Sequence, residues 1–346
     1  MSPGLTYLVV RCHSMMAELL SPAELRSLAE AESLEELMVK LDETPYAEFL
    51  RGVERRATAL EGAYHRAFIE RVGRVIDLAP GRMAPFLGDY YYMRMELLNL
   101  RRVMRGLYAG IPPERIAGEL LPLPPYRGPD PQLLLKAGDV EGAFKGLEGN
   151  IYHPPPEAVR LYEELEALWP LEQALINTYI GRVYESMEAL RGDERAVASR
   201  VVGVALDVEN LLAAVKRRGD YRAGRLPALE ALWPHTYRVG LETLRAVLEA
   251  RRVGEALDKL PQPYRGFLEP LLEGDVAGVR ANLNRHLYRM MWGERAKNDY
   301  GFNAVLAYLL FSEMEKEDLV RITWSIMQGL KHEDILKYLV VALPAA

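Results

Sequence analysis

The sequence predicts an all-α fold built from three helical repeats of about 110 residues each. Two observations carry this prediction. Apolar residues recur at three- and four-residue steps along nearly the whole chain, and no stretch alternates with period two between turn residues. One helical segment also occurs three times at nearly equal intervals. Self-similarity at a fixed period indicates a repeated structural unit, and this period is long enough for a small bundle of several helices.

The first helices of the chain carry explicit start signals. Residues 20–41 place leucines mostly three or four positions apart, as expected of amphipathic helices. Ser21 is suited to be an N-cap, Pro22 to occupy the first helical position, and Glu24 to complete a capping box. Ser33 begins a second signal of the same kind. We therefore expect one helix to begin after residue 21 and another after residue 33.

The helical period continues beyond this region and is interrupted by proline. Further helices are expected over residues 61–78, 155–169, 171–190, 236–257 and 279–292. Three proline-rich segments cannot be helix interior and are expected to be packed connections, at residues 120–131, 152–159 and 260–270. The chain should therefore alternate between helices and short, ordered loops.

The repeated segment has an acidic residue, then Asn or Asp three positions later, then Leu. The three copies of this pair are Glu96 with Asn99, Asp207 with Asn210, and Glu315 with Asp318. The two intervals between the second members are 111 and 108 residues, which divides the chain into repeats 1–118, 119–226 and 227–346. Residues 41–50 also resemble residues 260–269.

The spacing of each pair places both side chains on one face of a helix. Asn and Asp are unfavourable in the middle of a helix, because their side chains compete for backbone hydrogen bonds. We therefore expect these residues to be buried or half-buried anchors that bind a neighbouring helix or loop of the same repeat.

Basic residues follow the motif in two copies. They are Arg101, Arg102 and Arg105 in the first copy and Lys216, Arg217 and Arg218 in the second. The ordinary interpretation is a solvated helix face, with positive charge favourable near a helix C-terminus. The alternative is a contact patch for an acidic partner protein, although the third copy has only Arg321 nearby.

Composition excludes several classes of function. The net charge is −6, so no global positive field favours nucleic acid. Cys12 is the single cysteine, which excludes an intrachain disulfide and favours a reducing compartment. The N-terminus lacks the basic region of a signal peptide, and the longest apolar run, residues 302–311, is too short to span a membrane. Phosphate-binding loops, nucleophile elbows and metal-ligand pairs are absent, so we expect no cofactor, no metal and no catalytic site.

Residues 7–46 resemble the N-terminus of the C subunit of archaeal and bacterial A/V-type rotary ATPases, which is similar to the d subunit of the eukaryotic vacuolar enzyme. Residues 95–116 and 206–219 resemble the repeated acid-x-x-Asn-Leu helices of that family. The last copy departs from the pattern, with Asp318 in place of Asn and Val320 in place of a basic residue.

This resemblance implies an all-α, funnel-shaped collar of three repeats related by pseudo-threefold symmetry. It implies a non-catalytic rotor subunit, one copy per complex, that couples the central-stalk subunits to the membrane proteolipid ring. Proton- or sodium-linked ATP synthesis or hydrolysis would then depend on it. The location would be cytoplasmic, peripheral on the inner face of the cell membrane through the complex.

Two other interpretations remain open at this point. The first is a generic all-α repeat scaffold that binds another protein partner. The second is an all-α enzyme whose site is assembled from unconnected acids such as Glu18, Glu163 or Glu185. Titratable groups gathered in one deep pocket would favour the enzyme.

Overall fold

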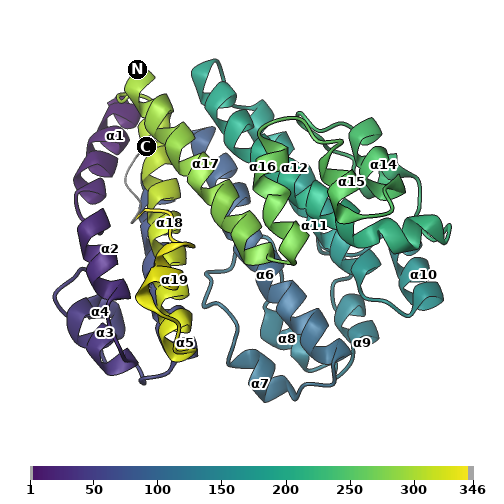
Figure 1. The fold of residues 1–346 in the computed structure, drawn as a ribbon, viewed down its shortest axis with the longest axis horizontal. Helices are drawn as coiled ribbons and strands as arrows, with labels where there is room; N and C mark the ends of the chain where they lie inside the picture. Colours follow the sequence, from purple (N-terminus) through teal and green to yellow (C-terminus); the bar gives the residue numbers. More distant parts are fainter. Residues whose placement is uncertain (1–2, 342–346) are drawn as a thin grey trace. The chain divides into compact units, whose positions relative to one another are not determined.

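The computed structural model describes residues 3–341, and within that range the regular structure is α-helical apart from one short 3-10 helix, η1, Glu269–Glu273 (Figure 1). The predicted all-α class is confirmed. The chain divides into two compact units. Unit 1 takes its described residues from 1–80, 191–223 and 236–346, and unit 2 consists of 81–190 and 224–235.

Unit 1 contains the first and the last described segments. Its helices are α1 (Pro3–Met16), α2 (Pro22–Ala29), α3 (Leu34–Leu41), α4 (Ala47–Leu50), α5 (Ala57–Leu78), α12 (Asp193–Arg222), α14 (Leu241–Glu249), α15 (Val253–Leu257), α16 (Tyr264–Leu268), α17 (Val276–Lys297), α18 (Phe302–Met327) and α19 (His332–Leu336). Helix α18 is its core element, because α1, α2, α3, α5 and α17 all pack against it, as the purple and yellow helices of Figure 1 show in part. Every residue from 302 to 311 is buried. A helix that is apolar on all faces requires such an enclosed position.

Unit 2 is arranged around α6. Its helices are α6 (Met83–Tyr108), α7 (Pro113–Ala117), α8 (Pro131–Leu135), α9 (Val140–Lys145), α10 (Pro156–Leu165), α11 (Trp169–Glu188) and α13 (Leu229–Leu232). Helix α6 packs against α7, α8, α9 and α11. Among residues 3–341, no helix is long and apolar enough to cross a membrane.

The expected start signals act as predicted. The Ser21 side chain accepts a hydrogen bond from the Glu24 backbone N–H, and the Glu24 carboxylate accepts one from the Ser21 N–H, which completes the capping box at the start of α2. The Ser33 hydroxyl likewise caps α3 by accepting from the Glu36 N–H. Local sequence alone sets these two helix starts.

Three expectations about the boundaries of helices and loops were wrong. The helix expected over 236–257 begins only at Leu241 and is broken between α14 and α15, because Ala250 and Arg252 have extended backbones. The expected loop at 260–270 contains α16 and the start of η1, and α10 begins inside the expected loop at 152–159. In η1 and α10 a proline occupies an early position of the helix, where the missing N–H is not required.

The helices follow a recurring order along the chain. Helices α2–α7 are three short helices, two long ones and a short one, and α8–α13 repeat that order. Helices α14–α19 repeat it again, with η1 added before the first long helix. Helix α1 stands outside the pattern.

Candidate functional site

The first copy of the motif lies in α6. Glu96 is buried, and its Oε1 accepts hydrogen bonds from the backbone N–H groups of Arg127 and Gly128 at 2.8 and 2.9 Å. The hydroxyl of Tyr152 donates to Oε2 at 3.4 Å. Burial raises the pKa of Glu96, although these hydrogen bonds favour its ionised form. The carboxylate thus ties α6 to the loop before α8 and to the loop before α10. Both loops lie beyond residue 118, so the expectation that the partners belong to the same repeat was wrong.

Asn99 lies one turn further along the same helix face. Its Nδ2 donates to the carbonyl oxygen of Leu121 at 2.9 Å, and its Oδ1 accepts from the N–H of Leu121 at 2.8 Å. One buried amide therefore satisfies both backbone groups of a single loop residue, which the interior would otherwise leave unpaired.

The second copy has the same construction in α12. Asp207 is fully buried and accepts four hydrogen bonds. The donors are the backbone N–H groups of Tyr237, Arg238 and Val239, at 3.0, 2.8 and 3.1 Å, and the hydroxyl of Tyr264, at 2.6 Å. A carboxylate surrounded by donors of this kind is a fixed anchor. Asn210, three residues later, is also buried.

The third copy, in α18, obtains its partners from the N-terminal part of the chain. The Glu315 side chain is buried and accepts from the backbone N–H of Leu20, from the hydroxyl of Tyr46 at 2.7 Å and from the guanidinium of Arg71 at 2.7 Å. Burial raises the pKa of Glu315, and the Arg71 cation opposes that rise. This acid is the centre of a buried charged network in unit 1.

Asp318 binds differently from Asn99. It accepts from the N–H groups of Val340 and Val341 at 2.9 and 2.8 Å, and from Arg321 at 3.1 Å. A carboxylate has no N–H to donate, so it takes two backbone donors where Asn99 pairs with one donor and one acceptor. Burial raises the pKa of Asp318 to about 6.

In the first copy, the cations after the motif bind acceptors elsewhere in unit 2. Arg101 and Arg105 both donate to Glu172 of α11, at 3.3 and 2.5 Å, and Arg102 donates to the carbonyl of Glu119. Arg105 is the most exposed of the three, with 57% of its side chain accessible. This run therefore fastens α6 to its neighbours and still presents one charge to solvent.

In the second copy, two of the cations bind residues of their own helix. Arg217 pairs with Asp220 at 3.2 Å, and Arg218 donates to the carbonyl of Val215 at 3.1 Å. Lys216 is exposed. Lys216 and Arg105 are thus the members of the six predicted interface residues that are best placed to meet a partner.

The acids considered for an enzyme are all on the surface. Glu18, Glu163 and Glu185 are each exposed, and Glu185 forms an ion pair with Arg182 of the same helix. Cys12 is buried, and burial raises the pKa of its thiol to about 12, so it is protonated at neutral pH. Within residues 3–341, no group of three or more His, Cys, Asp or Glu is arranged to hold a metal ion.

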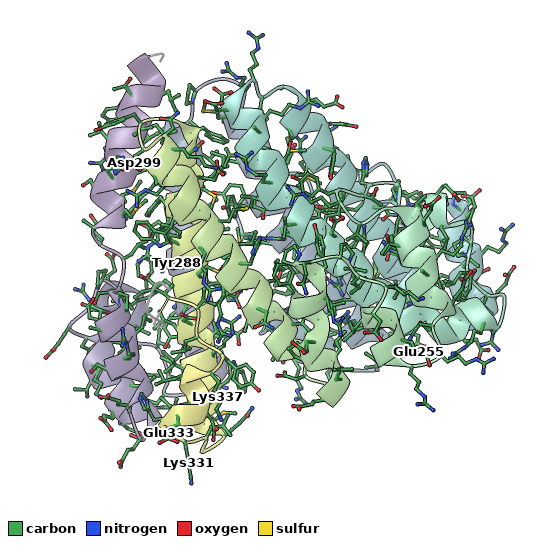
Figure 2. All side chains as sticks on the ribbon, turned by 45° about the horizontal axis from the view of Figure 1, so that its top comes forward. Glu255, Tyr288, Asp299, Lys331, Glu333 and Lys337 are labelled. Carbon is green, nitrogen blue, oxygen red and sulfur yellow. The ribbon has the colours of Figure 1, made fainter. Side chains whose placement is uncertain are left out.

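An open hollow lies at the C-terminal end of α17, lined by Trp292 and residues 295–300. Two of its charged groups are paired with each other, because Arg295 binds Asp299 at 2.7 Å, and Arg295 also lies over the ring of Trp292. Asp299, labelled in Figure 2 beyond the end of α17, also accepts through its backbone carbonyl from His13 of α1 at 2.9 Å. These contacts fasten α1 to α17.

The sequence pattern missed the residues that complete the anchors. Tyr46, Tyr152, Tyr264 and Arg71 were not singled out, although each donates to a motif carboxylate. A signal for two of them was present, because the similar segments 41–50 and 260–269 both place a tyrosine directly after proline.

Comparison with known proteins decides the family. Residues 8–338 match the model of the ATP synthase (C/AC39) subunit family. The chain belongs to this family. Several relatives with curated names also align with almost the whole chain.

One relative is the C subunit of the A-type ATP synthase of Thermococcus gammatolerans, 25% identical over 95% of this chain and 88% of that protein. The protein of the same name from Methanocaldococcus jannaschii is 22% identical over 96% and 86%. That from Archaeoglobus fulgidus is 23% identical over 97% and 96%. The resemblance to the C subunit of rotary ATPases is therefore confirmed.

Proposed function

We propose that this chain is a non-catalytic rotor subunit of an A/V-type ATPase or ATP synthase, which couples the central-stalk subunits to the membrane proteolipid ring. The observation that carries the proposal is the family match over residues 8–338, together with relatives named as the C subunit of A-type ATP synthases along nearly their full length. One copy per complex, held peripherally on the inner face of the membrane, is part of the proposal.

The packing of the motif acids supports a mechanical role. Glu96, Asp207 and Glu315 are each at most 8% exposed, and each is hydrogen-bonded to a backbone loop and to a tyrosine hydroxyl. Such anchors fix helices to loops that are distant in sequence. A part that transmits torque requires this stiffness, because a compliant body would absorb the rotation.

The repeat organisation is part of the same proposal. We assign the chain to helical repeats 1–118, 119–226 and 227–346, and the recurring order of short and long helices supports this division except at α13, which completes the second set but lies three residues beyond the second boundary. Arg105 and Lys216 are the proposed contact residues for an acidic partner surface, since both are exposed.

The first experiment is to purify the tagged chain from gently solubilised native membranes and to identify the accompanying proteins by mass spectrometry. Stalk subunits and the proteolipid should copurify, and deletion of this chain should detach the soluble sector from the membrane. Recovery as a free protein with unrelated companions would overturn the proposal and leave the generic scaffold.

The contact residues are tested in the same preparation. Lys216→Glu and Arg105→Glu should each reduce the recovery of partner subunits, and more so at low salt, where surface charges act over a longer range. Lys136→Glu is the matched control, because Lys136 is exposed and lies outside the repeated motif. Equal recovery with all three variants would remove these residues from the interface.

A further inference from the structure

Helix α17 carries five basic residues and a single acidic one, in a chain whose net charge is −6. Most of these cations have partners in the fold. The three ion pairs are Arg280 with Glu209 at 3.1 Å, Arg295 with Asp299 at 2.7 Å and Lys297 with Glu294 at 2.8 Å. Arg285 instead donates to the backbone carbonyl of Leu339 at 3.1 Å. Arg289 is the exception, because it is exposed and forms no ion pair within residues 3–341.

The groups near Arg289 are basic rather than acidic. His286, one turn earlier on α17, lies against the ring of Phe267, with the ring centroids 4.9 Å apart. Burial lowers the pKa of His286, and the charges of Arg289 and Arg238 lower it further. Arg238, in the loop before α14, is exposed and likewise has no ion pair in the described part of the chain. Two guanidinium groups without a carboxylate therefore lie near one imidazole.

This arrangement costs the isolated chain electrostatic free energy. Charges of one sign repel one another, and the repulsion is strongest where salt does not screen it. A partner that brings carboxylates to Arg238 and Arg289 would replace the repulsion with attraction, and it would be selected by its charge. The cluster thus has the electrostatic character of a surface for an acidic ligand.

An exposed aromatic side chain lies one turn beyond Arg289. Trp292 is 44% exposed, yet its ring is held in place, because it stacks on Phe311 with the ring centroids 5.0 Å apart and Arg295 lies over it at 5.0 Å. Tyr288, labelled in Figure 2, packs against the same Trp292 and Phe311 rings. An aromatic ring that is already immobilised loses little conformational entropy on binding, and Trp and Arg often dominate the free energy of an interface.

The hollow at the C-terminal end of α17 adjoins this side chain, because Trp292 is one of its lining residues. Its volume is about 430 Å³, and it is open to solvent. Tyr300, which also lines it, is 73% exposed. An apolar side chain of a partner would bury these two aromatic rings, while acids about one turn away would meet Arg289.

We propose that Arg238, Arg289, Trp292 and the hollow form a docking surface for an acidic segment of a partner protein, one that carries an apolar side chain next to its carboxylates. The carboxylates bind the two guanidinium groups, and the apolar side chain enters the hollow. A protein segment suits this surface better than an anionic bilayer, because the chain as a whole is negatively charged and a membrane surface would repel it. The inference goes beyond the proposed function and does not depend on it.

Photocross-linking in native membranes tests the surface on the full-length protein. The photoreactive residue p-benzoylphenylalanine replaces Tyr300, whose exposure makes the exchange harmless to the fold. After irradiation, mass spectrometry identifies the cross-linked peptide. We expect one protein segment that contains several Asp or Glu residues. Arg289→Glu and Trp292→Ala should each lower the yield of cross-link roughly tenfold, as expected of residues that dominate an interface.

Arg245→Glu is the matched control, because Arg245 is an exposed arginine of α14 that also has no ion pair among the described residues. Neither Arg245→Glu nor Arg289→Glu should change the helix content measured by circular dichroism. Replacing the acid found in the cross-linked segment with lysine should restore the yield in Arg289→Glu, since both charges of the pair are then reversed.

Four outcomes would overturn the inference: no cross-linked protein, a cross-link to lipid, a segment without acids, or a yield that Arg289→Glu leaves unchanged. The proposed function is tested separately by copurification, because the cross-link identifies whichever protein the surface contacts.

Discussion

Replacing Arg71 with methionine isolates the energetics of the buried pair with Glu315. Methionine keeps much of the length and the apolar volume of the arginine stem, but it removes the guanidinium that donates to Glu315 at 2.7 Å. The two side chains are 11% and 1% exposed, so water cannot replace the lost partner without a rearrangement. Glu315 would retain the N–H of Leu20 and the hydroxyl of Tyr46.

Removing one member of a buried ion pair costs about 3–5 kcal/mol, because the other charge stays buried without compensation. Unfolding entropy is about 2.1 cal/mol/K per residue, so for 346 residues 1 kcal/mol corresponds to about 1.4 °C. Arg71→Met should therefore lower the melting temperature by about 4–7 °C at neutral pH. Arg74→Met is the matched control on the same helix, since Arg74 and Glu70 are 50% and 46% exposed and such pairs contribute at most about 1 kcal/mol.

The loss should depend on pH in a defined direction. Burial raises the pKa of Glu315 above its ordinary 4.5. Its contribution to the free energy of unfolding is therefore largest below pH 4.5 and decreases as pH rises through the folded pKa. Without the guanidinium the folded pKa rises further, and the destabilisation should be smaller at pH 5 than at pH 8. The assay is urea unfolding followed by circular dichroism at both values. A loss below about 1 kcal/mol at pH 8, or the same loss at both values, would refute the argument.

Three further predictions concern other positions. In the natural chain, ionisation of Asp318 removes stability as pH rises, because the pKa of this carboxyl is about 6 in the folded state and 3.8 ordinarily. Asp318→Asn should abolish this effect, so the stability of the variant relative to the natural chain should improve by about 1 kcal/mol between pH 5 and 7.5 in urea melts. Gly203→Ala in α12 brings a methyl group against the ring of Tyr237 and should cost about 1–3 kcal/mol, whereas Gly219→Ala in the same helix meets open space and should gain up to about 1 kcal/mol; a reversed order in thermal melts would contradict the packing. Asn99→Leu leaves one backbone N–H and one C=O unpaired in the interior and should cost about 2–5 kcal/mol, so a melting temperature equal to that of the natural chain would show that this anchor is dispensable.

The sequence predicted local features well because local features have local causes. Ser21 and Glu24 cap a helix through atoms three residues apart, so the start of α2 could be predicted from the sequence alone. The break between α14 and α15 was missed, since alternating apolar and charged residues there fit one continuous helix as well as two short ones.

The anchor partners could not be predicted for a different reason. Helical spacing indicated that Glu315 shares a buried face with its neighbour, but the donor at Leu20 lies 295 residues away. The period of a helix does not specify which distant backbone amide will bind the Glu315 carboxylate. Similarly, a run of arginines after the motif did not reveal that Glu172 would bind two of them, because that contact depends on how α6 packs against α11.

The enclosed position of α18 has a consequence for how the protein is made. Helices α1, α2, α3 and α5 leave the ribosome before α18, yet this shared packing partner begins only at Phe302, about 220 residues after α5 ends. At about 5–20 residues per second, translation leaves these helices without it for roughly 11–45 s. Throughout that interval the apolar faces of these four helices are exposed to solvent and to the same faces on neighbouring nascent chains. Synthesis of α18 therefore determines when α1, α2, α3 and α5 are protected from aggregation, and holdase chaperones should bind these four helices until α18 has been made.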